Sequence, residues 1–280
     1  MVIIEFVLIL FFSSILAGVL GSIVGVGGGV VIIPVLTLFL GVDIHFAIGA
    51  SIVAIIGTSS GAATTYVRDK LTNLRVGMFL EVATTAGAIC GAAIAAYTNS
   101  VALELIFGSI LLVMLVPTVL KIGEDIPKNP ELKGLSKRLG LTGSYTELDG
   151  SIIKYNATRP EAGLVGMAVA GLLSGLLGIG GGAFKVLSMD IAMKLPMKVS
   201  TTTSNFMIGV TAAASAGIYF ARGDVNPLII APVALGILVG AMVGARLLIR
   251  SRNPTIRKAF AVVLAIAAVQ MILSSAGIKI

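Results

Sequence analysis

The sequence has no tryptophan, one cysteine, one histidine and few charges: only 12% of its 280 residues are charged. A soluble domain carries about 25% charged residues, so this scarcity excludes an ordinary soluble protein. Because Cys90 has no second cysteine to pair with, an internal disulfide is excluded. His45 alone cannot make a metal site, and no metal or cofactor is expected. Glu5 and the lack of a basic N-terminal region argue against a cleaved signal peptide.

Long apolar runs fill most of the chain, which is 57% hydrophobic. Their length favours membrane helices over the alternating pattern of a membrane barrel. The apolar segments are 4–24, 30–41, 45–66, 76–97, 101–120, 161–178, 183–195, 199–221, 227–249 and 256–277. We therefore expect an all-α polytopic membrane protein in lipid, with 1–120 and 161–280 as membrane repeats. Residues 121–160 form a polar connector, in which a short helix but no active site is expected.

Two runs of glycine interrupt these apolar segments. The first comprises Gly25, Gly27, Gly28 and Gly29, and the second comprises Gly178, Gly180, Gly181 and Gly182. Each glycine inside a helix costs about 1 kcal/mol relative to alanine. Within a membrane, a broken backbone is tolerated only where protein or a water-filled cavity satisfies it. The sequence therefore predicts two helix breaks, one in each half.

The two halves match at a constant offset of 153 residues, from Gly25 and Gly178 onwards. The matched pairs also include Ala17-Gly18 with Ala170-Gly171, Ser51 with Ser204, Tyr66 with Tyr219, Asn73 with Asn226, Gly87 with Gly240, Gly91 with Gly244 and Phe107 with Phe260. Chance similarity of apolar segments would not keep glycine, tyrosine and asparagine in one register. An internal duplication of this kind is typical of transporters built around a central site.

The charges of the loops indicate how the repeats are oriented. Basic residues gather in 67–75 and 121–160 in the first half, but in 194–198 and 246–258 in the second. The net charge of +7 is therefore an orientation signal, and no nucleic-acid partner is expected. Corresponding loops carry opposite signals, which predicts two inverted repeats of about 110 residues in the cell (inner) membrane. The connector 121–160 would then be cytoplasmic and both termini extracytoplasmic.

Inversion requires an odd number of crossings in each half, so we expect three spanning helices preceded by a helical hairpin broken at the glycines. Helix rise gives about 31 Å for 4–24 and about 18 Å for 30–41, against a membrane core of about 30 Å. The short second limb fits such a hairpin. The alternative is a full span in each half, with eight crossings and parallel repeats.

A helix that restarts after a glycine run presents free N–H groups and a positive dipole end, for which a small anion is the natural ligand. Lys185 follows the second run and is a candidate anion-binding residue; the alternative is that it reaches the interface. Ser51, Ser204 and Asn205 add donors, although small polar residues also serve helix packing.

Glu81 and Asp190 are the acidic residues that could take up a proton during transport. The alternative for Glu81 is an ion pair with Arg75 or Lys70. His45, beside Asp43, is expected at the interface. Gly87-x3-Gly91 and Gly240-x3-Gly244 indicate close helix contacts, either within the chain or between subunits of a homo-oligomer. Neither glycine run has the context of a nucleotide-binding loop, and no hydrolase motif marks an enzyme.

The segments AGVLGSIVGVGGGVVIIP (17–34), AIGASIVAIIGTSSGAATTY (47–66) and AGLLSGLLGIGGG (170–182) resemble the TauE/SafE-type sulfite exporter family. The resemblance extends through 87–92 and 199–205 and covers nearly the whole chain apart from 121–160. It implies a membrane carrier of small sulfur-containing anions such as sulfite, thiosulfate or organosulfonates, linked to proton-coupled transport. A departure from repeat symmetry is Lys185, which stands where the first half has Ile32.

We therefore expect a secondary transporter with a small anionic substrate, and with the two glycine runs forming its site. The alternatives are a passive anion channel and a structural membrane subunit that does not transport.

Overall fold

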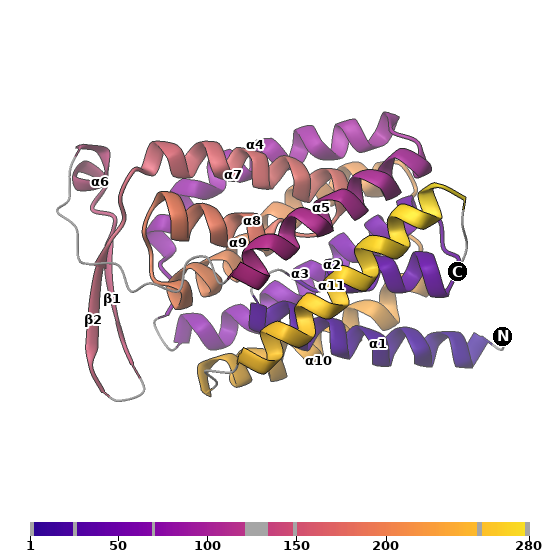
Figure 1. Ribbon diagram of the computed structural model, residues 1–280, viewed down its shortest axis with the longest axis horizontal. Helices are drawn as coiled ribbons and strands as arrows, with labels where there is room; N and C mark the ends of the chain where they lie inside the picture. Colours follow the sequence, from indigo (N-terminus) through magenta and orange to yellow (C-terminus); the bar gives the residue numbers. More distant parts are fainter. Residues whose placement is uncertain are drawn as a thin grey trace.

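The computed structural model describes residues 3–24, 27–68, 71–120, 134–147, 150–250 and 254–277, and helices make up most of it (Figure 1). The elements are α1 Ile3–Val24, α2 Gly29–Pro34, the π-helical turn η1 Val35–Phe39, α3 Ile44–Arg68, α4 Leu74–Tyr97, α5 Ser100–Leu120, α6 Gly134–Leu139, β1 Thr142–Thr146, β2 Ile152–Asn156, α7 Pro160–Leu177, α8 Gly182–Leu187, the π-helical turn η2 Ser188–Ala192, α9 Met197–Ala221, α10 Pro227–Arg250 and α11 Pro254–Ser275. The predicted all-α polytopic class is confirmed.

The helices have the length and surface of membrane spans. Among the described residues, six helices are long and apolar enough to cross a membrane: α1, α3, α4, α7, α9 and α10. Shorter apolar stretches lie in α5, in α11 and at Gly29–Phe39. Large apolar side chains such as Ile4, Val82 and Val165 are exposed on the outside. Such a surface suits lipid, and the number of crossings in each half stays a prediction.

The two halves fold alike, element by element. The bounds of α2, η1, α3 and α4 recur 153 residues later as those of α8, η2, α9 and α10. The expected hairpins are present, since α1 and α7 are each followed by a short second limb. Whether the repeats are inverted relative to the membrane stays a prediction.

Glycines bring the two halves into close contact. A Cβ on Gly87 of α4 would lie 2.2 Å from the carbonyl oxygen of Ala168 in α7. A Cβ on Gly240 of α10 would lie 2.1 Å from the carbonyl oxygen of Ile15 in α1. Ile15 and Ala168 are themselves 153 residues apart, so the two contacts are equivalent. The helix contacts expected at these glycines therefore join the halves of one chain.

An antiparallel β-hairpin lies at one end of the helices (Figure 1), and the sequence did not predict it. Asn73, which caps α4, donates hydrogen bonds to the hydroxyl of Tyr155 (3.1 Å) and to the carbonyl of Thr142 (3.2 Å). Glu147 of the hairpin pairs with Lys198 of α9. Burial and the nearby Glu147 raise the pKa of Tyr145 to about 12. The hairpin is therefore attached to the ends of α4 and α9.

Candidate functional site

Each half interrupts its helical hairpin at the predicted glycines. In the second half, Gly178, Gly180 and Gly181 have φ angles of +63°, +75° and +62°. In the first half, Gly27 has a φ of +81° and α2 begins at Gly29 after Gly28; Gly25 lies outside the described residues. These angles favour glycine because a Cβ would be strained there. Neither α2 nor α8 begins with a side-chain cap.

The two breaks lie against each other. Ser51 of α3 donates a hydrogen bond of 2.6 Å to the carbonyl oxygen of Gly178. A Cβ on Gly29 would lie 2.5 Å from that same oxygen. A Cβ on Gly28 would contact Ile237, near the middle of α10. The structure thus brings both breaks together beside the interior of α3 and α10, and the Gly178 carbonyl leaves no room for a Cβ on Gly29.

α9 brings its polar residues to the same place. Ser204 donates to the carbonyl of Gly182 at 3.2 Å, and the amide of Asn205 donates to the carbonyl of Ser22 at 3.1 Å. Ile208, four residues after Ser204, would be 3.7 Å from a Cβ on Gly27. Ser51, Ser204 and Asn205 thus donate to the backbone in or beside the breaks. Direct contact between these side chains and a substrate stays a prediction.

Lys185, in the first turn of α8, is completely buried, with 0% exposure. Its Nζ donates a hydrogen bond of 2.6 Å to the hydroxyl of Thr211 in α9. That hydroxyl in turn donates to Oε1 of Glu81 in α4, also at 2.6 Å. The alternative that Lys185 reaches the interface is therefore wrong.

Glu81 is 5% exposed and also accepts a hydrogen bond of 3.2 Å from Thr85. Its Oε2 is buried and has no hydrogen-bond partner among the described residues. Arg75 is not its partner, because that guanidinium donates to the carbonyl of Gly140 at 3.0 Å; Lys70 lies outside the described residues. The structure therefore brings together two predicted residues, Lys185 and Glu81, that are 104 positions apart in the sequence.

Two residues differ from the sequence-based prediction of the site: Asp190 was predicted and lies outside the bonded group, whereas Thr211 was not predicted and lies inside it. Asp190 is buried in η2, but it is not a member of the hydrogen-bonded series that joins Lys185 to Glu81. Thr211, which is not among the predicted site residues, joins the two charged groups through its hydroxyl. Its spacing could have indicated it, because Thr211 follows the predicted site residue Ser204 by two helical turns and therefore lies on the same face of α9.

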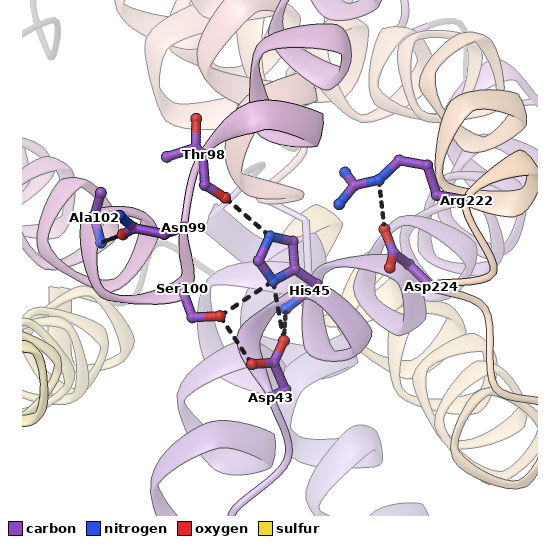
Figure 2. Close-up of polar contacts among 8 residues, drawn as sticks. All are labelled: Asp43, His45, Thr98, Asn99, Ser100, Ala102, Arg222 and Asp224. Carbon is purple, nitrogen blue, oxygen red and sulfur yellow. Dashed lines mark hydrogen bonds and ion pairs between the residues drawn. The ribbon is translucent and has the colours of Figure 1, made fainter.

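A second polar cluster lies where α4 meets α5, at the ends of α4 and α9 remote from the hairpin (Figure 2). His45 Nδ1 is 3.0 Å from Asp43 and 3.3 Å from the hydroxyl of Ser100, while Nε2 is 3.1 Å from the carbonyl of Thr98. In a catalytic triad, serine and aspartate approach opposite ring nitrogens. Here both approach Nδ1, so the cluster ties the start of α3 to the α4–α5 turn and is not a triad.

The chain matches a known protein family over most of its length. The family model described as "Sulfite exporter TauE/SafE" matches residues 10–271. The chain belongs to the TauE/SafE family. No solved structure matches this TauE/SafE protein.

Two relatives from Bacillus subtilis (strain 168) resemble the TauE/SafE chain over most of their length. "Probable membrane transporter protein YunE" is 28% identical over 271 residues, which cover 94% of this chain and 96% of that protein. "Probable membrane transporter protein YdhB" is 25% identical over 232 residues, which cover 82% and 86%. With its apolar helices, the TauE/SafE chain is a multi-pass membrane protein of a transporter family.

Proposed function

We propose that the protein is a secondary transporter that moves a small sulfur-containing oxoanion (sulfite, thiosulfate or an organosulfonate) across the cell membrane by proton-coupled alternating access. The observation that carries this proposal is the complete burial of Lys185 in the first turn after a glycine break. A charged side chain inside a membrane is costly, and it usually marks the path of a substrate or an ion. A lysine in this position favours an anion.

The backbone around Lys185 adds to this preference. The two breaks lie against each other, and neither short helix has a side-chain cap at its start. First-turn N–H groups of a helix lack partners within that helix, and they favour negative charge. Family membership supplies the sulfur oxoanion as the substrate class.

The arrangement of the repeats supports alternating access. α5 and α11, which occupy corresponding places in the two halves, pack together and run in opposite directions in Figure 1. This agrees with the inverted repeats predicted from the loop charges. In that topology the hairpin end is cytoplasmic, both termini are extracytoplasmic, and one repeat rocks against the other around the fixed breaks.

Reconstituted protein tests the proposal through uptake of labelled sulfite and thiosulfate into liposomes. We expect saturable uptake that depends on a pH gradient. Lys185→Met should lower uptake at least tenfold at limiting anion. The double variant Lys185→Met/Glu81→Gln removes both charges without leaving an unpaired one and should be equally inactive. Lys154→Met, on the exposed face of β2, is the matched control and should transport like the unaltered protein.

The same measurement separates the alternatives. Flux that rises linearly with concentration and ignores pH would indicate a passive channel. Absence of flux for every sulfur oxoanion, from a correctly folded protein, would favour a structural subunit. Unchanged uptake by the Lys185 variants would overturn the proposed site.

A further inference from the structure

We infer that Glu81, Thr211 and Lys185 form one coupling unit, in which an anion binds beside Lys185 only after Glu81 has taken up a proton. Proton and anion would then cross the membrane in the same direction, as in a symporter. This inference rests on the proposed function and adds to it the order of binding and the direction of coupling.

The hydrogen bonds give the unit a defined polarity. Lys185 donates to Thr211 at 2.6 Å, and of the two acceptors within reach of the Thr211 hydroxyl, Oε1 of Glu81 at 2.6 Å is closer than the carbonyl oxygen of Met207 at 2.9 Å. The hydroxyl therefore connects ammonium and carboxylate through a single atom, Oγ1. The other carboxylate oxygen, Oε2, is buried without a hydrogen-bond partner in the described part of the chain. That oxygen is the place where a proton can be added without breaking the connection.

Among the side chains that the structure describes, no other charged group pairs with Glu81 or Lys185. Lys185 and Glu81 are joined through the hydroxyl of Thr211 and are electrostatic neighbours of each other. The other charged groups on elements packed against α8, α4 and α9 have partners or exposure elsewhere. They are Asp190 in η2, Glu104 bonded to Ser274, exposed Glu161 in α7, Lys198 paired with Glu147, Arg75 bonded to Gly140 and Arg222 paired with Asp224.

Electrostatics then sets the order of binding. While Glu81 is ionised, it compensates the ammonium of Lys185, and an arriving anion would give the buried site excess negative charge. When Glu81 accepts a proton at Oε2, the ammonium is left uncompensated in a low-dielectric interior, which costs several kcal/mol. An anion beside Lys185 removes that cost. One proton on Glu81 and one anion at Lys185 therefore stabilise each other.

Thr211 is a positioning residue in this unit. Its hydroxyl also lies 2.9 Å from the carbonyl of Met207, one turn earlier in α9. The hydroxyl can therefore turn to its own helix when Glu81 becomes neutral. Replacing it with valine keeps the shape of the side chain but removes the connection, whereas serine keeps the hydroxyl.

Thiosulfate is a suitable probe because its charge does not change near neutral pH. Its affinity for the purified full-length protein would be measured by calorimetry in mildly acidic to mildly alkaline buffers. We expect the dissociation constant to rise by up to about tenfold per pH unit above the titration of Glu81, as one linked proton requires. Two buffers of different ionisation heat should report uptake of one proton per anion bound.

Variants test each part of the unit. Glu81→Gln should remove the pH dependence and hold the affinity near its acidic value, and Thr211→Val should weaken the pH dependence while Thr211→Ser restores it.

Binding by the unaltered protein without pH dependence or proton uptake would overturn the coupling and leave the proposed function standing. A pH profile unchanged in Glu81→Gln, or in Thr211→Val, would overturn the role of that residue. If the unaltered protein binds neither thiosulfate nor sulfite at any pH, the proposed function itself fails.

Discussion

Beside one glycine break, Lys185, Thr211 and Glu81 form a chain of hydrogen bonds; at the repeat-equivalent positions beside the other stand Ile32, Thr58 and Ala234. In the described part of the chain, the hydroxyl of Thr58 donates to its own helix, to the carbonyl of Ala54 at 3.3 Å. The backbone is thus repeated while the charge is not. The first half contributes Glu81 and the second half contributes Lys185 and Thr211, so both ionisable groups gather beside the second break, while the first break has the same backbone without them.

The two ends of the molecule differ in a similar way. Asn73 and Asn226 are repeat equivalents, and each accepts a hydrogen bond near the start of a long helix. Asn73 also donates hydrogen bonds to the β-hairpin, whereas in the described part of the chain the Asn226 side chain accepts a hydrogen bond from Leu228 N–H alone. The β-hairpin therefore packs at the Asn73 end of the molecule, and the described residues have no equivalent hairpin at the Asn226 end.

The largest expected effect on stability comes from comparing methionine substitutions at Lys185 and at its repeat equivalent, Ile32. Lys185→Met should lower the free energy of unfolding by about 3–5 kcal/mol, because it leaves the carboxylate of Glu81 buried without its cation. Ile32→Met, a swap of similar volume between apolar residues, should cost less than about 1.5 kcal/mol. Denaturant-induced unfolding of the two variants in detergent measures the difference.

The double variant Lys185→Met/Glu81→Gln is the control for charge. It should recover most of the loss, because neither charge remains. Equal destabilisation by the two methionine variants would show that Lys185 acts through packing alone, and the contrast in charge between the two breaks would then have no energetic basis.

A smaller effect is expected at the paired asparagines. Asn73→Ala should cost about 1–2 kcal/mol through loss of the α4 cap, and its hydrogen bonds to the hairpin are lost as well. Asn226→Ala, in the exposed turn, should cost about 0.5 kcal/mol. Hydrogen exchange should rise in β1 and β2 only in Asn73→Ala. If the hairpin amides stay protected in that variant, Asn73 does not hold the hairpin.

Local signals explain why much of the frame could be predicted from the sequence. The apolar segments, the offset of 153 residues and the glycine runs are visible without any contact information. The hairpin is not evident from the sequence because each strand has five residues and one buried side chain, Tyr145 in Thr142–Thr146 and Tyr155 in Ile152–Asn156, which is too short for a recognisable alternation. Lys185 and Glu81 could be chosen separately as charges in apolar segments. Their connection through Thr211 depends on how α4, α8 and α9 pack, which no local pattern encodes.

The smallest expected effect concerns Asp43, whose repeat equivalent is Pro196 and which therefore has no titratable counterpart. Partial burial opposes its ionisation, but hydrogen bonds from the His45 backbone, Ser100 and the His45 ring outweigh this and hold its pKa below the usual 3.8. A lowered pKa means that the ionised carboxylate stabilises the fold above about pH 4, and that this contribution is lost as pH falls through the folded value. Because 48% of the Asp43 side chain is exposed, the contribution should be less than about 1 kcal/mol. Unfolding of Asp43→Asn and of the unaltered protein should therefore differ slightly at neutral pH and converge in acid, whereas a constant difference would assign the effect to the lost hydrogen bonds rather than to the charge.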